Sequence, residues 1–220
     1  ATRAAISFTA GTDMALSILE ADGSVSLTAT AGAITDNLTG ETGTDFNIKG
    51  TTTAVYLKAK NGIGTSGSGD IDTQIASLTH VENSTAGDIF IQEADGLSIT
   101  TDGITSYGSS GSVVLDLTAG SLAIDNALAV TGSVGNILLS ASGSITVSAA
   151  LTSSAGNIRA GIRYSISRRS NPDRARRESG SPGSSRRSPA GEEARTRRRT
   201  PCETARSTDS TPTGRRIPSS

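Results

Sequence analysis

The segment Gly62-Ile63-Gly64-Thr65-Ser66-Gly67 is the part of the sequence most suited to holding a cofactor. It fits G-x-G-x-x-G and follows a plausible strand over residues 52–58, which is how a dinucleotide-binding turn begins. Such a turn also needs a helix that starts at the third glycine. Residues 66–70 continue instead as a Gly/Ser loop, so the motif predicts a plain turn and we expect no cofactor.

Two aspartates, Asp70 and Asp72, form the only closely spaced acidic pair that could hold calcium. Calcium-binding Gly/Asp repeats supply a carboxylate from each turn and carry the pattern G-G-x-G-x-D. This sequence lacks that pattern. Solvated turn acids are therefore the favoured interpretation, no metal site is predicted, and calcium binding remains a side hypothesis.

A polysaccharide lyase or hydrolase on a β-helix needs clustered carboxylates with Arg or Lys on one face. Asp88 and Asp116 stand at non-equivalent places in their repeats, so they are not expected to stack into a site. His80 has no second His or Cys nearby in the sequence for a metal site or a triad, and a surface or loop position is expected for it. The basic residues up to Ala160 are only Arg3, Lys49, Lys58, Lys60 and Arg159. The sequence thus predicts no catalytic residues and no enzyme.

Beyond residue 160 the chain is rich in Arg, Ser and Pro, which is the composition of a nucleic-acid-binding tail. It has no aromatic residue after Tyr164 to stack on bases, and Ile217 is the only large aliphatic residue after Arg168. We therefore expect residues 161–220 to be disordered and to bind no specific nucleic acid. Out-of-frame translation explains the abrupt change of composition most simply, and the tail then has no evolved function.

Charge separates the same two segments. Up to Ala160 there are 5 Lys and Arg against 15 Asp and Glu, whereas the remainder holds 15 Arg against 6 acids. The single cysteine, Cys202, has no partner, so no disulfide is possible within the chain. No long apolar run predicts a membrane span. The sequence starts at Ala1 with no signal-peptide core in view, which favours a fragment or a processed start.

Internal repeats decide the expected fold. Blocks that begin at Gly87, Gly111 and Gly135 align with one another, and a fourth begins at Gly156, at spacings of 24, 24 and 21 residues. Each of the three full blocks has two alternating apolar pairs followed by a third apolar position. The first pairs are Ile89/Ile91, Val113/Leu115 and Ile137/Leu139, the second are Leu97/Ile99, Leu122/Ile124 and Ile145/Val147, and the third positions are Ile104, Leu128 and Leu151.

Alternation with period two places each pair on one face of a short strand, so a block indicates three strands separated by Gly, Asn, Asp and Ser turns. Three strands in about 21–24 residues form one coil of a parallel β-helix whose coils stack into a continuous aliphatic core. We expect an all-β chain with regular coils over residues 87–160.

Residues 1–86 show the same pattern of alternating apolar pairs and turns less regularly, and they are expected to form irregular coils. Their apolar pairs are Leu16/Ile18, Val25/Leu27, Phe46/Ile48 and Val55/Leu57. The spacing of Ile71, Ile75 and Leu78 is closer to that of a helix, so a short helix or loop is expected between Asp70 and His80.

Over residues 10–160 the pattern Asn61-Gly62-Ile63-Gly64, Ile71-Asp72-Thr73 and Gly87-Asp88-Ile89-Phe90-Ile91, followed by Gly-Ser-Ile strands, resembles the repeats of large bacterial exoproteins of the filamentous-haemagglutinin type. The resemblance implies a right-handed parallel β-helix that serves as a stalk or adhesive rod, with no catalytic residues to carry over.

The expected function is therefore a structural or adhesive solenoid segment of a secreted or cell-surface bacterial protein. Its expected partners are host or neighbouring cell-surface glycans or proteins, together with the adjoining coils of a longer parent chain. Two alternatives stay open: a β-helix polysaccharide-active enzyme, and nucleic-acid binding by the Arg-rich tail.

Overall fold

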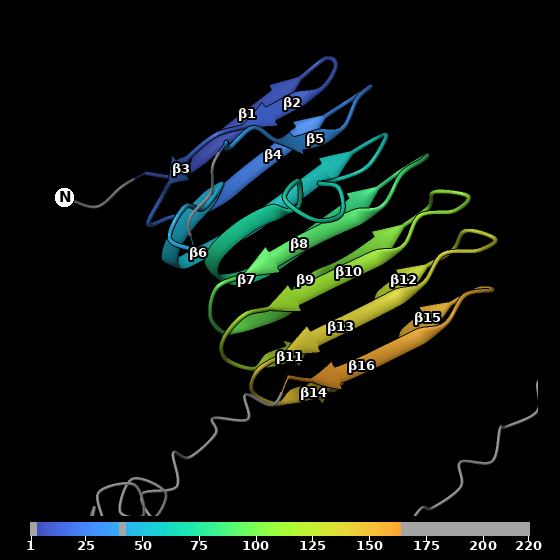
Figure 1. Cartoon of the computed structure of the whole chain (residues 1–220). Coiled ribbons are helices and arrows are strands. Elements are labelled where there is room, and N and C mark those ends of the chain that lie inside the picture. The colour runs from blue at the N-terminus through green and yellow to red at the C-terminus, as the bar shows by residue number, and fades with distance from the viewer. Residues whose placement is uncertain (1–3, 40–42, 164–220) are drawn as a thin grey trace, which may run out of the picture. The chain divides into compact units, whose positions relative to one another are not determined.

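The computed structural model describes residues 4–39 and 43–163, and within them every regular element is a β-strand. The strands stack as a solenoid of about seven turns (Figure 1). Their bounds are β1 Ile6–Ala10, β2 Met14–Leu16, β3 Leu19–Glu20, β4 Val25–Ala29, β5 Ile34–Asp36, β6 Ile48–Ala59, β7 Ile71–Asn83, β8 Ile89–Glu93, β9 Leu97–Ser106, β10 Val113–Leu117, β11 Leu122–Ile124, β12 Leu128–Val130, β13 Ile137–Ala141, β14 Ile145–Val147, β15 Leu151–Ser153 and β16 Ile158–Ile162. The expected all-β parallel solenoid is confirmed.

Strand pairing follows the repeat. Ile89 pairs with Val113, Val113 with Ile137, and Ile137 with Ile158, always in parallel, which reproduces the spacing seen in the sequence. The second and third strands of each coil pair in the same way, β9 with β11 and β12, and these with β14 and β15. Each coil therefore occupies three sides of the solenoid, and each side is a parallel ladder.

The expectation of a short helix or loop between Asp70 and His80 is wrong, because residues 71–83 form the single long strand β7. This strand pairs with β8 through Ile71 and with β9 through Leu78 and Val81, so it passes around more than one side of the coil. Register shifts against β6 between Ile75 and Ser77, and against β6 and β9 between Leu78 and His80, mark the bends. Bending rotates the inward side out of strict alternation, which gave the apolar residues their helix-like spacing.

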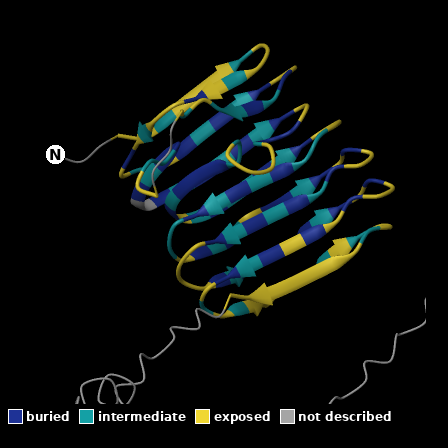
Figure 2. Ribbon diagram, viewed as in Figure 1, coloured by how far each residue is buried: buried dark blue, intermediate teal, exposed yellow. Residues whose placement is uncertain are grey.

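A continuous aliphatic core fills the solenoid. Figure 2 shows buried and less buried residues alternating along the strands. Val113, Leu115 and Leu117 are fully buried in β10, whereas the outward Val114 and Asp116 between them are partly exposed. Isoleucine, leucine and valine stack on their own equivalents in neighbouring coils, and one coil alone would leave this surface in water.

In the less regular part, Val25, Leu27, Val55 and Leu57 are buried as the alternation predicts. Ile18 is not: its side chain is 55% exposed because β2 ends at Leu16 and β3 begins only at Leu19. The chain turns a corner between these two strands, so the strict alternation that predicted an inward Ile18 does not hold there.

Corner side chains tie successive coils together. Asp88 accepts a hydrogen bond from the Ser112 backbone N–H (2.6 Å), the Ser112 hydroxyl accepts one from Asn136 N–H (3.1 Å), and the Asn136 side-chain oxygen accepts one from Asn157 N–H (2.8 Å). These four residues occupy equivalent corners, which we call the corner column. The side chains of the first three residues each satisfy a backbone donor of the following coil.

Glycine is required where the backbones of adjacent coils meet. Gly103 has φ of 74°, and a Cβ on it would collide with the Ala127 carbonyl oxygen of the next coil. Gly64 has φ of 66°, and a Cβ there would meet the Phe90 carbonyl oxygen. Both positions combine a left-handed backbone with a close approach that no other residue fits.

The last strand, β16, continues to Ile162, two residues past the expected end of the solenoid. The tail assigned to residues 161–220, with its Arg runs and Cys202, lies outside the described residues from Tyr164 onward. No helix in the described part of the chain is long and apolar enough to cross a membrane.

Candidate functional site

One side of the solenoid, which we call face one, carries a row of polar side chains. It is formed by the start of β7 with β8, β10, β13 and β16. Asp72 pairs with Gln92, Gln92 with Asp116, and Asp116 with Ser140, so these four outward positions stand in one column across the strands. We call them the polar ladder.

The ladder is held by direct contacts. The Gln92 side-chain nitrogen donates to the Asp72 carboxylate (2.6 Å), and the Asp72 backbone N–H donates to the Asn47 side-chain oxygen (2.8 Å). Asn47 is fully buried and also donates to Asp36 (2.6 Å). Farther along the ladder, next to its last position Ser140, Asp116 forms an ion pair with Arg163.

Two hollows lie beside the ladder. The loop before β7 and the strands β8 and β10 enclose an open hollow lined by Ser66, Gly67, Asp70, Phe90, Ile91, Gln92, Val114 and Asp116. A second hollow is lined by Gly43, Asp45, Phe46, Asp72, Thr73, Gln92, Ala94 and Thr118. Gln92 belongs to both, so the two hollows meet at the ladder.

The carboxyl groups of this surface influence one another's pKa values. The pKa of Asp70 is raised to about 6, chiefly by burial and with a contribution from the negative charges of Asp72, Asp116 and Asp36, against a backbone hydrogen bond that lowers it. Burial also raises the pKa of Asp72, and the hydrogen bond from Gln92 opposes this rise. A carboxyl with a pKa near 6 beside other carboxyl groups has electrostatics suited to general acid or base chemistry.

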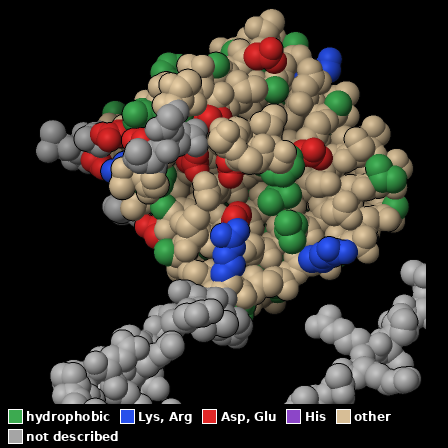
Figure 3. Space-filling model, viewed as in Figure 1, with side chains coloured by type: hydrophobic (Ala, Val, Ile, Leu, Met, Phe, Trp, Pro, Cys, Tyr) green, Lys and Arg blue, Asp and Glu red, His purple; other side chains and the backbone are tan. Residues whose placement is uncertain are grey.

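An apolar strip runs beside the ladder. Phe90 pairs with Val114 and Val114 with Leu138, each two residues before a ladder position on the same strand. The Leu138 side chain is 43% exposed. Figure 3 shows hydrophobic side chains gathered into a strip on this face, with acidic and basic side chains beside it.

The residues singled out in the sequence have separate places. The glycine motif forms a turn in which Ile63 bridges Ile34 and Ile89, and β7 follows it with no helix between. Asp88 caps the corner column, whereas Asp116 lies inside β10, so the expected lack of stacking between these two is confirmed. Asp116 joins Asp70 and Asp72 instead.

Among residues 4–39 and 43–163, no group of three or more His, Cys, Asp and Glu side chains is arranged to hold a metal ion. No known family, curated protein or solved structure matches this chain. What the surface can do therefore follows from its own geometry.

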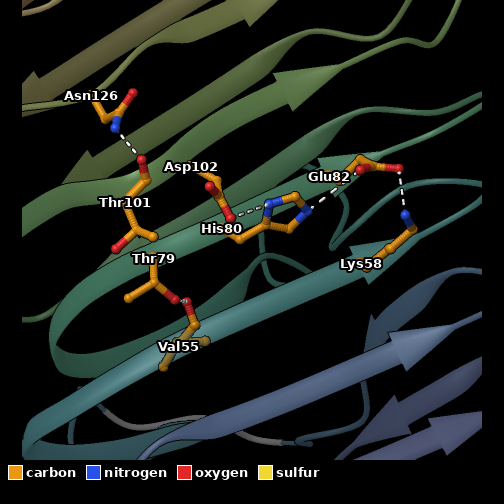
Figure 4. Close-up of polar contacts among 8 residues, drawn as sticks. All are labelled: Val55, Lys58, Thr79, His80, Glu82, Thr101, Asp102 and Asn126. Carbon is orange, nitrogen blue, oxygen red and sulfur yellow. Dashed lines mark hydrogen bonds and ion pairs between the residues drawn. The ribbon is translucent and has the colours of Figure 1, made fainter.

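A second polar cluster lies on β6, β7 and β9 around His80 (Figure 4). The imidazole stacks on Tyr56 with ring centroids 4.4 Å apart and 9° between the planes. Its nitrogens lie 3.4 Å from a Glu82 oxygen and 3.5 Å from an Asp102 oxygen, outside hydrogen-bond geometry. Glu82 also pairs with Lys58 (3.0 Å) and raises the pKa of that amine chiefly by this hydrogen bond.

Of the two positions expected for His80, the loop is wrong, because this residue is in strand β7; its side chain is partly exposed, at 19%. Thr101, beside the cluster, has φ of 55°, the only positive value at a non-glycine residue in the described chain. Its carbonyl oxygen accepts a hydrogen bond from the Asn126 side chain. The cluster links three successive coils at the bend that interrupts β7 and β9.

Glu93 is a third feature, and it is fully buried. Its carboxyl accepts hydrogen bonds from the Thr73 hydroxyl (2.7 Å) and from the backbone N–H groups of Ile75 (3.3 Å) and Asp95 (3.2 Å). Burial raises its pKa to about 8, in spite of the bonds from Thr73 and Asp95. This side chain satisfies donors inside a corner and does not belong to the outer surface of face one.

Gln92 and Phe90 were not singled out from the sequence, although a signal for them existed. The alignment of Ile89/Ile91 with Val113/Leu115 also places Gln92 over Asp116 and Phe90 over Val114. The position of Asp72 under Gln92 could not be found in this way, because residues 71–83 depart from the repeat.

Proposed function

We propose that this chain is a structural and adhesive segment of a secreted or cell-surface bacterial protein of the filamentous-haemagglutinin type. The observation that carries the proposal is the continuous parallel pairing of strands from β1 through β4, β6, β7, β8, β10 and β13 to β16, which changes side of the coil within β7. Such stacking turns chain length into the length of a stiff rod, and repeats the same outward positions along it. Adhesion needs both a spacer and a repeated contact surface.

Further coils of a parent chain are the proposed neighbours of the last strands. At these strands the apolar positions that are buried in earlier coils are open: Val147 is 45% exposed, Ile158 44% and Ile162 43%. One more coil in register would cover them and would pair the free backbone groups of β16.

Adhesion is tested with the full chain immobilised on beads. The beads are allowed to settle on epithelial cells or on a bacterial lawn, and are then removed by flow. We expect retention at least several-fold above that of beads coated with the Leu139→Asp variant, which places a charge in the core and prevents stacking. Equal retention for the two proteins on both surfaces would contradict an adhesive role.

A second candidate function, hydrolysis of polysaccharides, is favoured by one observation. Asp70, with its pKa raised to about 6, lines one hollow together with Asp116, and the charges of both Asp72 and Asp116 act on it. Glycoside hydrolases use such a pair, one carboxyl as acid and the other as base or nucleophile. Release of reducing ends from neutral polysaccharides near pH 6, lost in Asp70→Asn and retained in Asp88→Asn, would establish this activity. Its absence across such substrates would exclude it.

A further inference from the structure

We propose that face one binds an extended polysaccharide without acidic groups, which lies along the apolar strip beside the polar ladder. The inference rests on the proposed adhesive function and names the ligand class and the contact residues. It requires no catalysis.

The first reason is that the surface is divided lengthwise into an apolar and a polar half. The strip and the ladder occupy outward positions two residues apart on the same strands, so they run side by side at about 7 Å. Each half repeats at every coil, about 4.8 Å along the axis. A sugar ring has the same division, because its C–H face is apolar and its hydroxyl groups project from the rim.

The second reason is the set of polar atoms beside the strip. Gln92 contributes an amide, and the partly exposed Asp116 contributes a carboxylate that accepts hydrogen bonds from hydroxyl groups, whereas Asp72 is buried and holds the Gln92 amide in place. One carboxylate oxygen of Asp116 is buried and has no hydrogen-bond partner, while its other oxygen pairs with Arg163.

The third reason is charge, which decides among polysaccharides. Asp45, Asp70, Asp72 and Asp116 line the two hollows and no basic side chain does, whereas Arg159 and Arg163 lie at the β16 end of the face, beside Leu138 and Asp116. Uronic acids or sulfated sugars would be repelled there, since like charges brought together across an interface disfavour the wrong partner. Both hollows are open to solvent along the face, so the surface suits a chain that passes over it more than an enclosed small molecule.

The test is titration calorimetry of the full chain with three neutral hexasaccharides, namely cellohexaose, xylohexaose and chitohexaose, and with hexagalacturonate as the acidic probe. We expect at least one neutral probe to bind and hexagalacturonate to bind at least tenfold more weakly. Phe90→Ala and Gln92→Ala should each weaken binding of the neutral probe at least fivefold. Phe8→Ala is the matched control, because Phe8 is 54% exposed on β1, away from face one, and it should leave binding unchanged.

Failure to bind any neutral probe, equal binding of hexagalacturonate, or unchanged binding in both variants would each overturn the inference. Circular dichroism of each variant confirms that the β-structure is retained, and Gln92→Ala removes no apolar burial from the core. The bead assay separates the two proposals: retention that survives Phe90→Ala and Gln92→Ala supports adhesion while rejecting face one as its contact surface.

Discussion

The Gln92 side chain donates a hydrogen bond of 2.6 Å to Asp72, its register partner on the neighbouring strand. This bond joins two coils whose spacing differs from that of the regular repeat, and it lies where both hollows meet. It also opposes the effect of burial on the Asp72 pKa, so one amide both fixes the geometry of the ladder and helps to keep it charged.

The buried Glu93 should make the protein less stable as pH rises. Its pKa is about 8 in the folded chain against an ordinary 4.5, so between these values the folded state keeps a proton that the unfolded chain has lost. The free energy of unfolding should fall by about 1.4 kcal/mol per pH unit in this interval from this group. Urea titrations at pH 5 and pH 8 measure the change.

Glu93→Gln is the control for that experiment, because glutamine has the shape of the protonated acid and does not ionise. The variant should be close to the wild type in stability at pH 5 and more stable at pH 8. An identical pH dependence in the two proteins would show that the Glu93 carboxyl is not the group that titrates.

The two adjacent leucines in β13 should differ sharply in how much each contributes to the free energy of unfolding. Leu139 is fully buried and Leu138 is 43% exposed. Leu139→Ala leaves a cavity in the aliphatic column and should cost about 2–5 kcal/mol, whereas Leu138→Ala should cost about 1 kcal/mol or less. Denaturation of both variants tests the inward register of β13, and similar losses would mean that this register is wrong.

Gly103→Ala should destabilise the chain more than Gly11→Ala. The first places a Cβ against the Ala127 carbonyl oxygen in a left-handed backbone, whereas the second meets no atom within 4 Å. We expect a loss of roughly 1–3 kcal/mol for Gly103→Ala and little change for Gly11→Ala, since strain of this kind costs about that much. Thermal unfolding followed by circular dichroism compares them, and equal melting temperatures would count against the close approach.

The corner column predicts a selective effect at Asn136. Asn136→Ala removes the acceptor for the Asn157 backbone N–H and should cost about 0.5–1.5 kcal/mol. Asn136→Asp keeps an acceptor oxygen and should retain most of the stability. The readout is hydrogen exchange at the Asn157 amide, which should quicken in the alanine variant and stay near wild type in the aspartate variant.

The regular coils could be predicted from the sequence because their spacing is a simple repeat. Pairs such as Ile137/Leu139 alternate, and alternation maps directly onto an inward and an outward side. The bends could not be predicted in this way. Ile71, Ile75 and Leu78 all face inward in β7, but the register shift against β6 between Ile75 and Ser77 changes the spacing of the inward positions.

The candidate site was only partly visible for the same reason. Asp70 and Asp72 stood out as an acidic pair, but their meeting with Asp116 depends on how an irregular coil stacks under regular ones. A short motif likewise does not predict how far a side chain is buried. Glu20 and Glu93 both begin the motif Glu-Ala-Asp-Gly, yet Glu20 is exposed and Glu93 is fully buried. Burial is set by the coil above and below, which a short motif does not contain.

The last full coil is three residues shorter than the one before it, but the pairing of the core strands is unchanged. Ile158 still pairs with Ile137 just as Ile137 pairs with Val113. The missing residues come from the turns between strands, since β13 to β15 have the same lengths as β10 to β12. A gene for such a rod can therefore gain or lose codons at the corners, or duplicate a whole coil by unequal recombination, and still encode a chain that stacks.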